Sequence, residues 1–258
     1  MTAAQTRSRL RQYLAYKGAD RAHLRFFLNT ITNHLEDASI FGGMVRDFSL
    51  GYARSFRSDI DVVTLSPAKD IYNCIKHLNP IRNKFGGFRF IAGEYLFDIW
   101  SFYDTWAIQE GLIAGETLKD LCDTTFFSLD AALFRLNDEK LITSSNYETH
   151  VKNRILGINL REHPDPIKIA KRAIQMALAK NLTLTSELCE FIVRNINADA
   201  RKTYDAPMFH RIHEHLEKTP YQNFKPHTQL SIWPSEENCE AHGFATRHDQ
   251  SDACRSFL

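Results

Sequence analysis

Two aspartates separated by one apolar residue, in the stretch SDIDVV at positions 58–63, are the residues best suited to chemistry in this chain. On a β-strand, residues two apart point to the same face, so we expect Asp59 and Asp61 side by side while Ile60 and Val62 enter the core. Carboxylates that close repel each other, by about 4 kcal/mol at ~4 Å and an effective dielectric near 20. Mg²⁺ removes this repulsion and favours carboxylate, water and phosphate oxygens as ligands. The pair therefore indicates a metal site, and the plainer alternative is a solvated strand face.

A third acid, Asp98, interrupts the apolar stretch YLFDIW at positions 95–100. If it faces Asp59 and Asp61 from a neighbouring strand, the three carboxylates complete a site for two Mg²⁺ ions roughly 3.5–4 Å apart. One ion would activate an attacking hydroxyl, and the other would hold a triphosphate and its leaving group. This hypothesis requires Asp98 to face the other two acids and the gap among the three to hold no lysine or arginine. The alternative for Asp98 is a charge on an edge strand.

The elements that must position these acids alternate between strands and helices. Glycine is unfavourable inside either element, so the adjacent Gly42 and Gly43 indicate a turn or a close approach of the backbone to another group. Before the two acids, the patterns predict a helix over 24–35 with Asp20 as its N-cap, a strand over 38–41 that runs into the glycines, and a short helix closed by Gly51. The acids themselves begin a strand predicted over 59–65. After it, we expect a helix that begins at Ser66–Pro67, and strands over 88–91 and 95–102 joined by a turn at 92–94.

Helical periodicity dominates beyond residue 115, in the stretches 117–136, 165–180 and 185–196. In the second stretch one face is apolar, while Lys168, Lys171 and Arg172 project from the other with no acid among them. Such a stripe either binds phosphates or is a solvated helix face. We expect an α+β fold with a head domain over 1–115, a helical neck-like domain over 116–218 and an irregular C-terminal segment over 219–258.

The composition of the 258 residues is that of a soluble globular protein, with 43% hydrophobic and 24% charged residues. A net charge of +1 gives no global attraction to nucleic acid, so such binding would need a local basic patch. No apolar run has the length of a membrane span or of a signal-peptide core. The five scattered cysteines argue against disulfide partners and for a reducing compartment, which predicts a cytoplasmic protein without a membrane partner.

The C-terminal quarter contains histidines and cysteines with incomplete metal-ligand spacing. Free thiols and surface imidazoles are the simpler assumption, and the alternative is a zinc site formed by one of two groups: His210, His213 and His215, or Cys239, His242, His248 and Cys254.

The order and spacing of GGMVRDFSLG and SDIDVV, over residues 41–63, resemble the polymerase β-like nucleotidyltransferase superfamily. Within it, the stretch is similar to the head of class II CCA-adding enzymes and bacterial poly(A) polymerases. The resemblance implies a small mixed sheet with flanking helices, followed by a helical neck. It also implies that Gly42 and Gly43 approach the incoming triphosphate, that Arg46 and Asp47 support the nucleotide pocket, and that Asp59 and Asp61 bind the metals.

Fainter similarity extends over residues 38–195, and its departures are informative. The family has Arg-Arg-Asp where this chain has Thr124, Thr125 and Phe126, so charges expected near the triphosphate and ribose are missing. The base-selecting acid-acid-x-x-Arg motif of the family is not legible here. Asp165, Lys168, Lys171 and Arg172 are the nearby candidates for base or RNA contacts.

The sequence thus favours an Mg²⁺-dependent nucleotidyltransferase. It would move a nucleoside monophosphate from an NTP to a hydroxyl, with an RNA 3′ end such as that of tRNA as the preferred acceptor, and release pyrophosphate. One alternative is a toxin- or defence-type transferase that modifies tRNA, a protein or a small molecule. Another is a catalytically inactive head that binds nucleotides.

Overall fold

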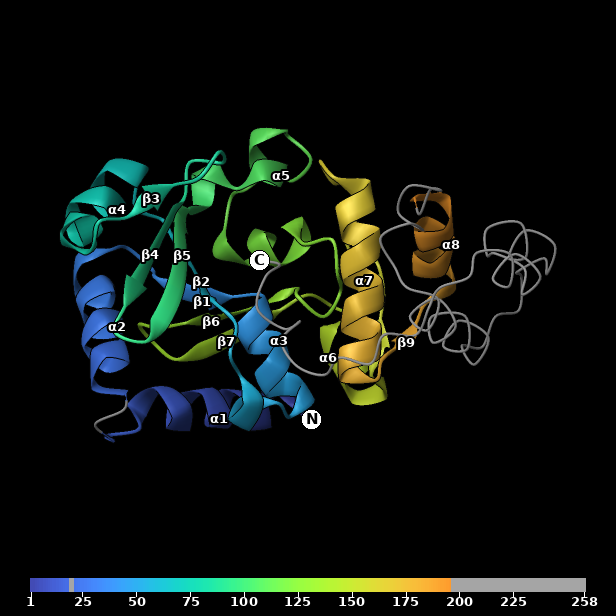
Figure 1. Ribbon diagram of the computed structural model, residues 1–258, viewed down its shortest axis with the longest axis horizontal. Coiled ribbons are helices and arrows are strands. Elements are labelled where there is room, and N and C mark those ends of the chain that lie inside the picture. Colours follow the sequence, from blue (N-terminus) through green and yellow to red (C-terminus); the bar gives the residue numbers. More distant parts are fainter. Residues whose placement is uncertain (19–20, 196–258) are drawn as a thin grey trace, which may run out of the picture. The chain divides into compact units, whose positions relative to one another are not determined.

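A seven-stranded sheet is the centre of the computed structural model, which describes residues 1–18 and 21–195 (Figure 1). The strand order is β3-β4-β5-β2-β1-β6-β7. Only the central pair β2 and β5 is parallel among these neighbours, so the sheet is mixed. The strands are β1 (Ser39–Phe41), β2 (Ile60–Thr64), β3 (Ile81–Arg82), β4 (Phe88–Ala92), β5 (Tyr95–Ser101), β6 (Ala132–Arg135) and β7 (Lys140–Thr143).

Alternation along the central strands separates a face that is mainly apolar from a face that carries both the acids and a second apolar cluster around Val63. Ile60 and Val62 of β2 are fully buried, as expected, and so are Phe97 and Ile99 of β5. Helix α2 (Ala22–His34) covers this apolar side, where the ring of Phe27 packs at a tilt against that of Phe97 with centroids 4.5 Å apart. Helices α3 (Gly43–Leu50) and α4 (Ala68–Ile75) extend the apolar layer, and α1 (Ala3–Ala15) packs against α3. The acids of β2 and β5 are therefore left on the opposite face.

The predicted elements of the head are confirmed, with boundaries shifted by one to three residues. Helix α3 begins at the paired glycines and ends at Gly51, whose φ of 96° is the left-handed conformation that closes a helix. The turn at residues 92–94 joins β4 to β5. Asp20, the expected N-cap, lies outside the described residues. Within the ranges 1–18 and 21–195, no helix combines the length and hydropathy that a membrane span requires.

The expectation of helix over residues 117–136 is wrong. A 3-10 helix covers Leu118–Thr124, and strand β6 follows it in the central sheet. The residues of β6 between Ala132 and Phe134 are buried, because β1 and β7 flank the strand and the chain packs on both faces. A strand buried on both faces has a continuous apolar run, which periodicity cannot distinguish from a buried helix.

The segment after the sheet is mainly helical. It contains α6 (Tyr147–Asn153), α7 (Pro166–Lys180) and α8 (Ser186–Asn195), with β8 (Ile155–Leu156) and β9 (Thr183–Leu184) paired in parallel. Helices α7 and α8 pack side by side (Figure 1). The domain boundaries at 115 and 218 stay a prediction, although β6 and β7 show that the head sheet draws strands from beyond residue 115.

Candidate active site

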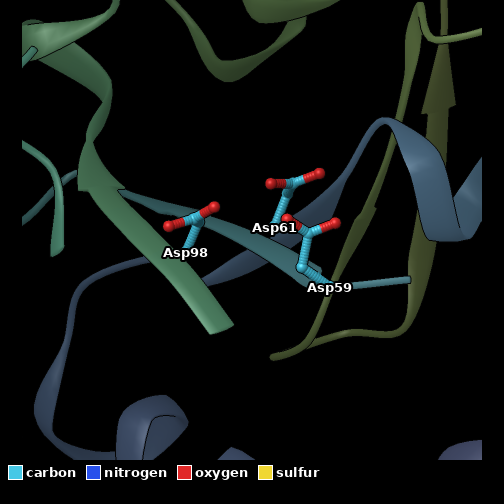
Figure 2. Close-up of side chains that lie close together, drawn as sticks. All are labelled: Asp59, Asp61 and Asp98. Carbon is cyan, nitrogen blue, oxygen red and sulfur yellow. The ribbon is translucent and has the colours of Figure 1, made fainter. Parts of the chain in front are cut away.

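The three predicted metal ligands lie together at the junction of β2 and β5 (Figure 2). Asp61 of β2 is the register partner of Asp98 of β5, and Asp59 directly precedes β2. One carboxylate oxygen from each residue lies within 4.8 Å of the others. Asp98 thus faces Asp59 and Asp61, as the hypothesis requires. Their role as metal ligands remains a prediction.

The second requirement, a gap free of basic side chains, is not met. Arg89 of β4 is the register partner of Asp98 and lies on the same face. Its Nε and Nη2 donate to the Asp98 carboxylate at 2.9 and 2.5 Å, and Nη2 also donates to Asp59 Oδ2 at 3.3 Å. Among the described residues, Asp61 makes no ion pair with a basic side chain. Arg89 therefore neutralises part of the cluster and occupies the side of it next to Asp98.

Asp61 has the most perturbed carboxyl group of the cluster. Burial, together with the charges of Asp59 and Asp98, raises its pKa to about 8. A raised pKa means that the folded protein disfavours the ionised form of this group. The negative charge around Asp61 is therefore not fully compensated by the protein. A divalent cation coordinated by these carboxylate oxygens would compensate it.

This pKa predicts how the stability of the metal-free protein depends on pH. Asp61 is protonated at higher pH in the folded chain than in the unfolded chain, where its pKa is near the model value of 3.8. Its contribution to the free energy of unfolding therefore falls as pH rises from about 4 to about 8. Urea denaturation of the wild type and Asp61→Asn in EDTA should show this slope in the wild type only. Parallel pH profiles for the two proteins would contradict the prediction.

The paired glycines bring the backbone next to Asp61. Gly42 has a φ of 62° and ψ of −115° and caps the N-terminus of α3, a conformation that side-chain-bearing residues rarely adopt. A Cβ built on either Gly42 or Gly43 would lie 3.9 Å from Asp61 Oδ2. The first turn of α3 has free backbone N–H groups and the positive end of the helix dipole, which favours anions. The glycines therefore leave an open anion-binding helix end beside the acids.

A cavity of about 570 Å³ opens in front of two of the three acids and the paired glycines, whereas Asp59 does not line it. Its walls include Asp61, Asp98, the turn between β3 and β4, and the start of α7. Of the predicted RNA or base contacts, Asp165, Lys168 and Arg172 line the cavity and Lys171 does not. Asp165 is also the N-cap of α7 and accepts a hydrogen bond from the Lys168 N–H at 2.9 Å.

Several aromatic side chains line the cavity. Trp100, Trp106 and Phe126 line the cavity, and the His163 ring lies 6.2 Å from that of Trp106 and 6.1 Å from that of Phe126. Burial lowers the pKa of His163, so its ring is neutral at pH 7. Thr124 and Thr125 also line the cavity. The missing Arg-Arg-Asp charges thus leave a neutral surface, and the cations of the cavity come from α7 and from the β3–β4 turn.

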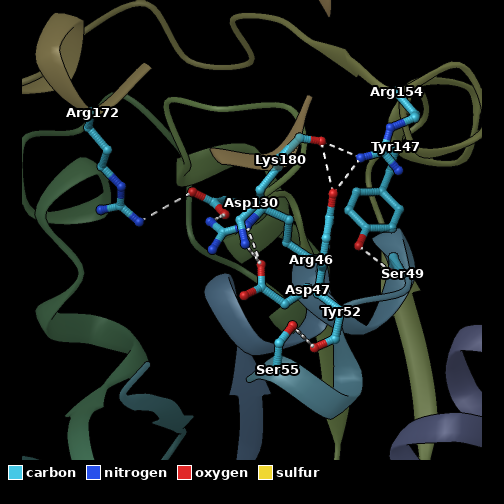
Figure 3. Close-up of polar contacts among 10 residues, drawn as sticks. All are labelled: Arg46, Asp47, Ser49, Tyr52, Ser55, Asp130, Tyr147, Arg154, Arg172 and Lys180. Carbon is cyan, nitrogen blue, oxygen red and sulfur yellow. Dashed lines mark hydrogen bonds and ion pairs between the residues drawn. The ribbon is translucent and has the colours of Figure 1, made fainter. Parts of the chain in front are cut away.

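Arg46 and Asp47 do not line the cavity but belong to a buried ion-pair network (Figure 3). The Arg46 guanidinium donates to Asp47 at 2.8 Å and to Asp130 at 2.6 Å. The side chains of all three are at most 11% exposed. Lys180, at the end of α7, pairs with Asp47 at 2.8 Å, and Arg172 lies 3.6 Å from Asp130. The pair predicted to support the nucleotide pocket therefore joins α3 to α7, and its role at a nucleotide stays a prediction.

A second set of contacts fixes the same helix end. The Tyr52 hydroxyl donates to the Lys180 carbonyl at 3.1 Å, and Arg154 donates to both the Tyr52 hydroxyl, at 2.7 Å, and that carbonyl. Ser49 of α3 shares a 2.7 Å hydrogen bond with the buried Tyr147 of α6. The glycine turn and the basic residues of α7 are thus held on opposite walls of one cavity.

Sequence reasoning missed Arg89, Asp130, Lys180 and the residues of the β3–β4 turn. One of these had a signal, because Asp130 is an acid in a buried apolar run and therefore requires a cation. Arg89 pairs with Asp98 because the observed turn is one residue shorter than expected, with Ala92 of β4 opposite Tyr95 of β5. The histidines and cysteines considered for zinc lie outside the described residues.

No protein-family model matches the chain, and no curated protein sequence matches it. Solved structures do. The Thermotoga maritima CCA-adding enzyme complexed with tRNA-CCA matches 85% of this chain at 16% identity and a TM-score of 0.53, and 52% of that chain is covered. A CCA-adding enzyme in complex with CTP matches the same share at 18% identity and a TM-score of 0.53. A tRNA nucleotidyltransferase complexed with a primer tRNA and an ATP analogue matches 79% of the chain at 17% identity, a TM-score of 0.50 and 65% coverage of its own length.

These matches establish the fold class. The chain has a polymerase β-like nucleotidyltransferase fold and resembles CCA-adding enzymes, as the motifs indicated. It spans between half and two thirds of the length of these three structures.

Proposed function

We propose that this protein is an Mg²⁺-dependent nucleotidyltransferase that moves a nucleoside monophosphate from an NTP to the 3′ hydroxyl of an RNA. The observation that carries the proposal is the cluster of Asp59, Asp61 and Asp98, of which Asp61 and Asp98 line a cavity of about 570 Å³ together with the paired glycines. That volume is within the usual range of about 300–1,000 Å³ for small-molecule sites.

The donor set fits magnesium. Three carboxylates supply only oxygen ligands, which Mg²⁺ prefers, and the raised pKa of Asp61 reports negative charge that the protein does not fully neutralise. Asp59 and Asp61 would hold both ions, and Asp98 would complete the site for the ion next to the acceptor. Bound there, Mg²⁺ lowers the pKa of a hydroxyl and neutralises charge on phosphoryl oxygens.

The other residues of the cavity would bind and orient the nucleotide. The free N–H groups at the start of α3 suit phosphate oxygens, and Gly42 and Gly43 allow the phosphates to come close because neither has a side chain. Lys168 and Arg172 add positive charge from the opposite wall. The aromatic wall formed by Trp106, Phe126 and His163 offers a flat apolar surface for a base.

In the reaction, the acceptor oxygen forms a bond to the α-phosphorus while the bond from that phosphorus to the pyrophosphate oxygen breaks. The hydroxyl proton is released to water, and pyrophosphate carries away the electron pair of the broken bond. The protein forms no covalent intermediate in this scheme, so catalysis depends on positioning and on charge stabilisation.

The turn between β3 and β4 supports a nucleic-acid acceptor. Phe85 is 46% exposed at the rim of the cavity, and Lys84 lies 4.8 Å from its ring centroid. Exposed aromatic rings flanked by cations are typical of surfaces that stack single-stranded bases. The rim lies on the Asp98 side of the cavity, where the acceptor hydroxyl must arrive.

We therefore expect Phe85→Ala to raise the KM for an RNA acceptor roughly tenfold, since one stacked base contributes about 1–3 kcal/mol. The KM for the NTP should not change, and Phe85→Trp should retain the wild-type value. Phe26→Ala, at a phenylalanine of α2 that is 73% exposed and does not line the cavity, is the matched control. Steady-state kinetics with a labelled oligonucleotide measure both constants. An unchanged RNA KM in Phe85→Ala would exclude this role.

The ion pairs of Arg89 favour a second candidate, a head that binds nucleotides without catalysis. In that case Arg89 would permanently replace the metal at Asp98. Isothermal calorimetry with NTP in Mg²⁺ and in EDTA separates the candidates, because a head without a metal site binds nucleotide equally in both.

The decisive experiment incubates the protein with each of the four α-labelled NTPs, Mg²⁺ and either total RNA or total protein. Our proposal predicts label in RNA. Label in protein would favour a toxin- or defence-type transferase, and no label with any NTP would favour the binding head. A cytoplasmic location remains a prediction from the composition.

A further inference from the structure

Arg89 is held against the acid cluster by the geometry of the sheet. It is paired in register with Asp98 across β4 and β5, and neighbouring residues of β4 on the other face, Phe88 and Phe90, are buried. The pleat therefore directs Arg89 to the face of the acids. Two of its nitrogens contact Asp98, the nearer at 2.5 Å, and one reaches Asp59 at 3.3 Å.

The contacts divide the cluster unequally. Both oxygens of Asp98 accept from Arg89, whereas Asp59 contributes only Oδ2 and Asp61 contributes none. A guanidinium that donates hydrogen bonds to one carboxylate from two nitrogens competes with any metal ion that would be coordinated by the same oxygens. An ion bound by Asp59 and Asp61 does not require those oxygens. The cluster thus offers one accessible ion position and one that Arg89 covers.

The covered position can still open, because Arg89 is not buried. Its side chain is 44% exposed, while that of Asp98 is 14% exposed. The flexible stem of an exposed arginine can move its charged end into solvent without disturbing the core. The pairing also raises the pKa of Arg89, so the residue stays charged at every pH at which the protein is folded.

We propose that Arg89 is a tethered cation that excludes one of two divalent ions from Asp98. The metal-free protein then binds a first ion at Asp59 and Asp61, and a second ion enters only when Arg89 leaves Asp98. This inference rests on the proposed function, since it concerns the same metal site. It adds that the second ion, and with it activation of the acceptor, is controlled by a residue of the chain itself.

Mn²⁺ titration followed by electron paramagnetic resonance tests the proposal, because the signal of free Mn²⁺ gives the number and affinity of bound ions. The wild type should bind one ion tightly and a second at least tenfold more weakly, a difference of about 1.4 kcal/mol. Arg89→Met should bind the second ion about tenfold more tightly than the wild type. Arg89→Lys keeps the positive charge but cannot donate two parallel hydrogen bonds to Asp98. Its affinity for the second ion should therefore lie between those of the wild type and Arg89→Met.

Arg172→Met is the charge-matched control. The Arg172 charge lowers the pKa of Asp61, so this residue also acts on the cluster electrostatically, but it contacts Asp130 rather than Asp98. If it tightens the second ion as much as Arg89→Met does, the effect is one of net charge and the proposal is overturned. Identical two-ion binding by the wild type and Arg89→Met also overturns it, while leaving the proposed function intact. If no variant binds Mn²⁺, the metal-dependent function itself fails.

Discussion

Replacement of Asp61 by alanine is expected to reduce kcat/KM for nucleotidyl transfer by roughly 10³-fold or more, the scale of losing a charge-stabilising group in an active site. Asp61 is the acid of the cluster that Arg89 leaves free, and it lies beside both the glycine turn and Asp98. Without it, the remaining carboxylates cannot hold an ion against the triphosphate. Incorporation of an α-labelled NTP into RNA measures the effect.

The same variant should fold and should be no less stable than the wild type without metal. The raised pKa of Asp61 shows that its charge is unfavourable in the folded chain, and active-site groups of this kind often reduce stability. Asp138→Ala is the control, because Asp138 is an acid paired with Arg135 outside the cavity. Wild-type turnover by Asp61→Ala would remove the mechanism, whereas an unfolded Asp61→Ala would make the loss uninformative and would require Asp61→Asn in its place.

Replacement of Arg46 by methionine is expected to lower the free energy of unfolding by about 3–5 kcal/mol, because it leaves two buried carboxylates without their main partner. Asp47 keeps Lys180 at 2.8 Å, but Asp130 keeps only Arg172 at 3.6 Å. For a unit of this size, the midpoint of thermal unfolding should fall by roughly 10 °C. Chemical denaturation and circular dichroism measure the two quantities.

Arg135→Met provides the comparison for that prediction. Arg135 pairs with Asp138 at 2.5 Å at a site where Asp138 is 45% exposed, and exposed pairs contribute about 0–1 kcal/mol. A loss of less than 1 kcal/mol in Arg46→Met would show that the buried network does not hold α3 against α7. The KM for NTP should rise in Arg46→Met as well, since Lys168 and Arg172 belong to the helix that this network anchors.

The parts of the site that could be predicted from sequence are those that short-range geometry determines. Asp59 and Asp61 share a face because side chains alternate along a strand, and Gly42, Gly43 and Gly51 bound a helix because glycine tolerates the conformations at its ends. Asp98 could be joined to the same site only as a hypothesis, because spacing alone does not reveal that β2 and β5 are parallel neighbours.

The remaining features depend on contacts between distant segments. The head takes β6 from beyond residue 115, and that strand has the apolar content of a helix because it is buried between two others. The role of Arg46 was expected at the nucleotide, but its partner Asp130 lies 84 positions further along the chain. Arg89 depends on the same kind of detail. The predicted three-residue turn at residues 92–94 would pair it with Phe97, and only the observed register, in which Ala92 pairs with Tyr95, brings it opposite Asp98.

The central claim is that Asp59, Asp61 and Asp98 hold divalent ions that the nucleotide shares. Crystals grown with saturating Mn²⁺ and a non-hydrolysable NTP analogue test it most directly, through anomalous diffraction at the manganese absorption edge. Our account predicts anomalous peaks about 2.1 Å from oxygens of all three carboxylates, with Arg89 turned away from Asp98. A bound nucleotide without such peaks, and with Arg89 still bridging Asp59 and Asp98, would contradict it.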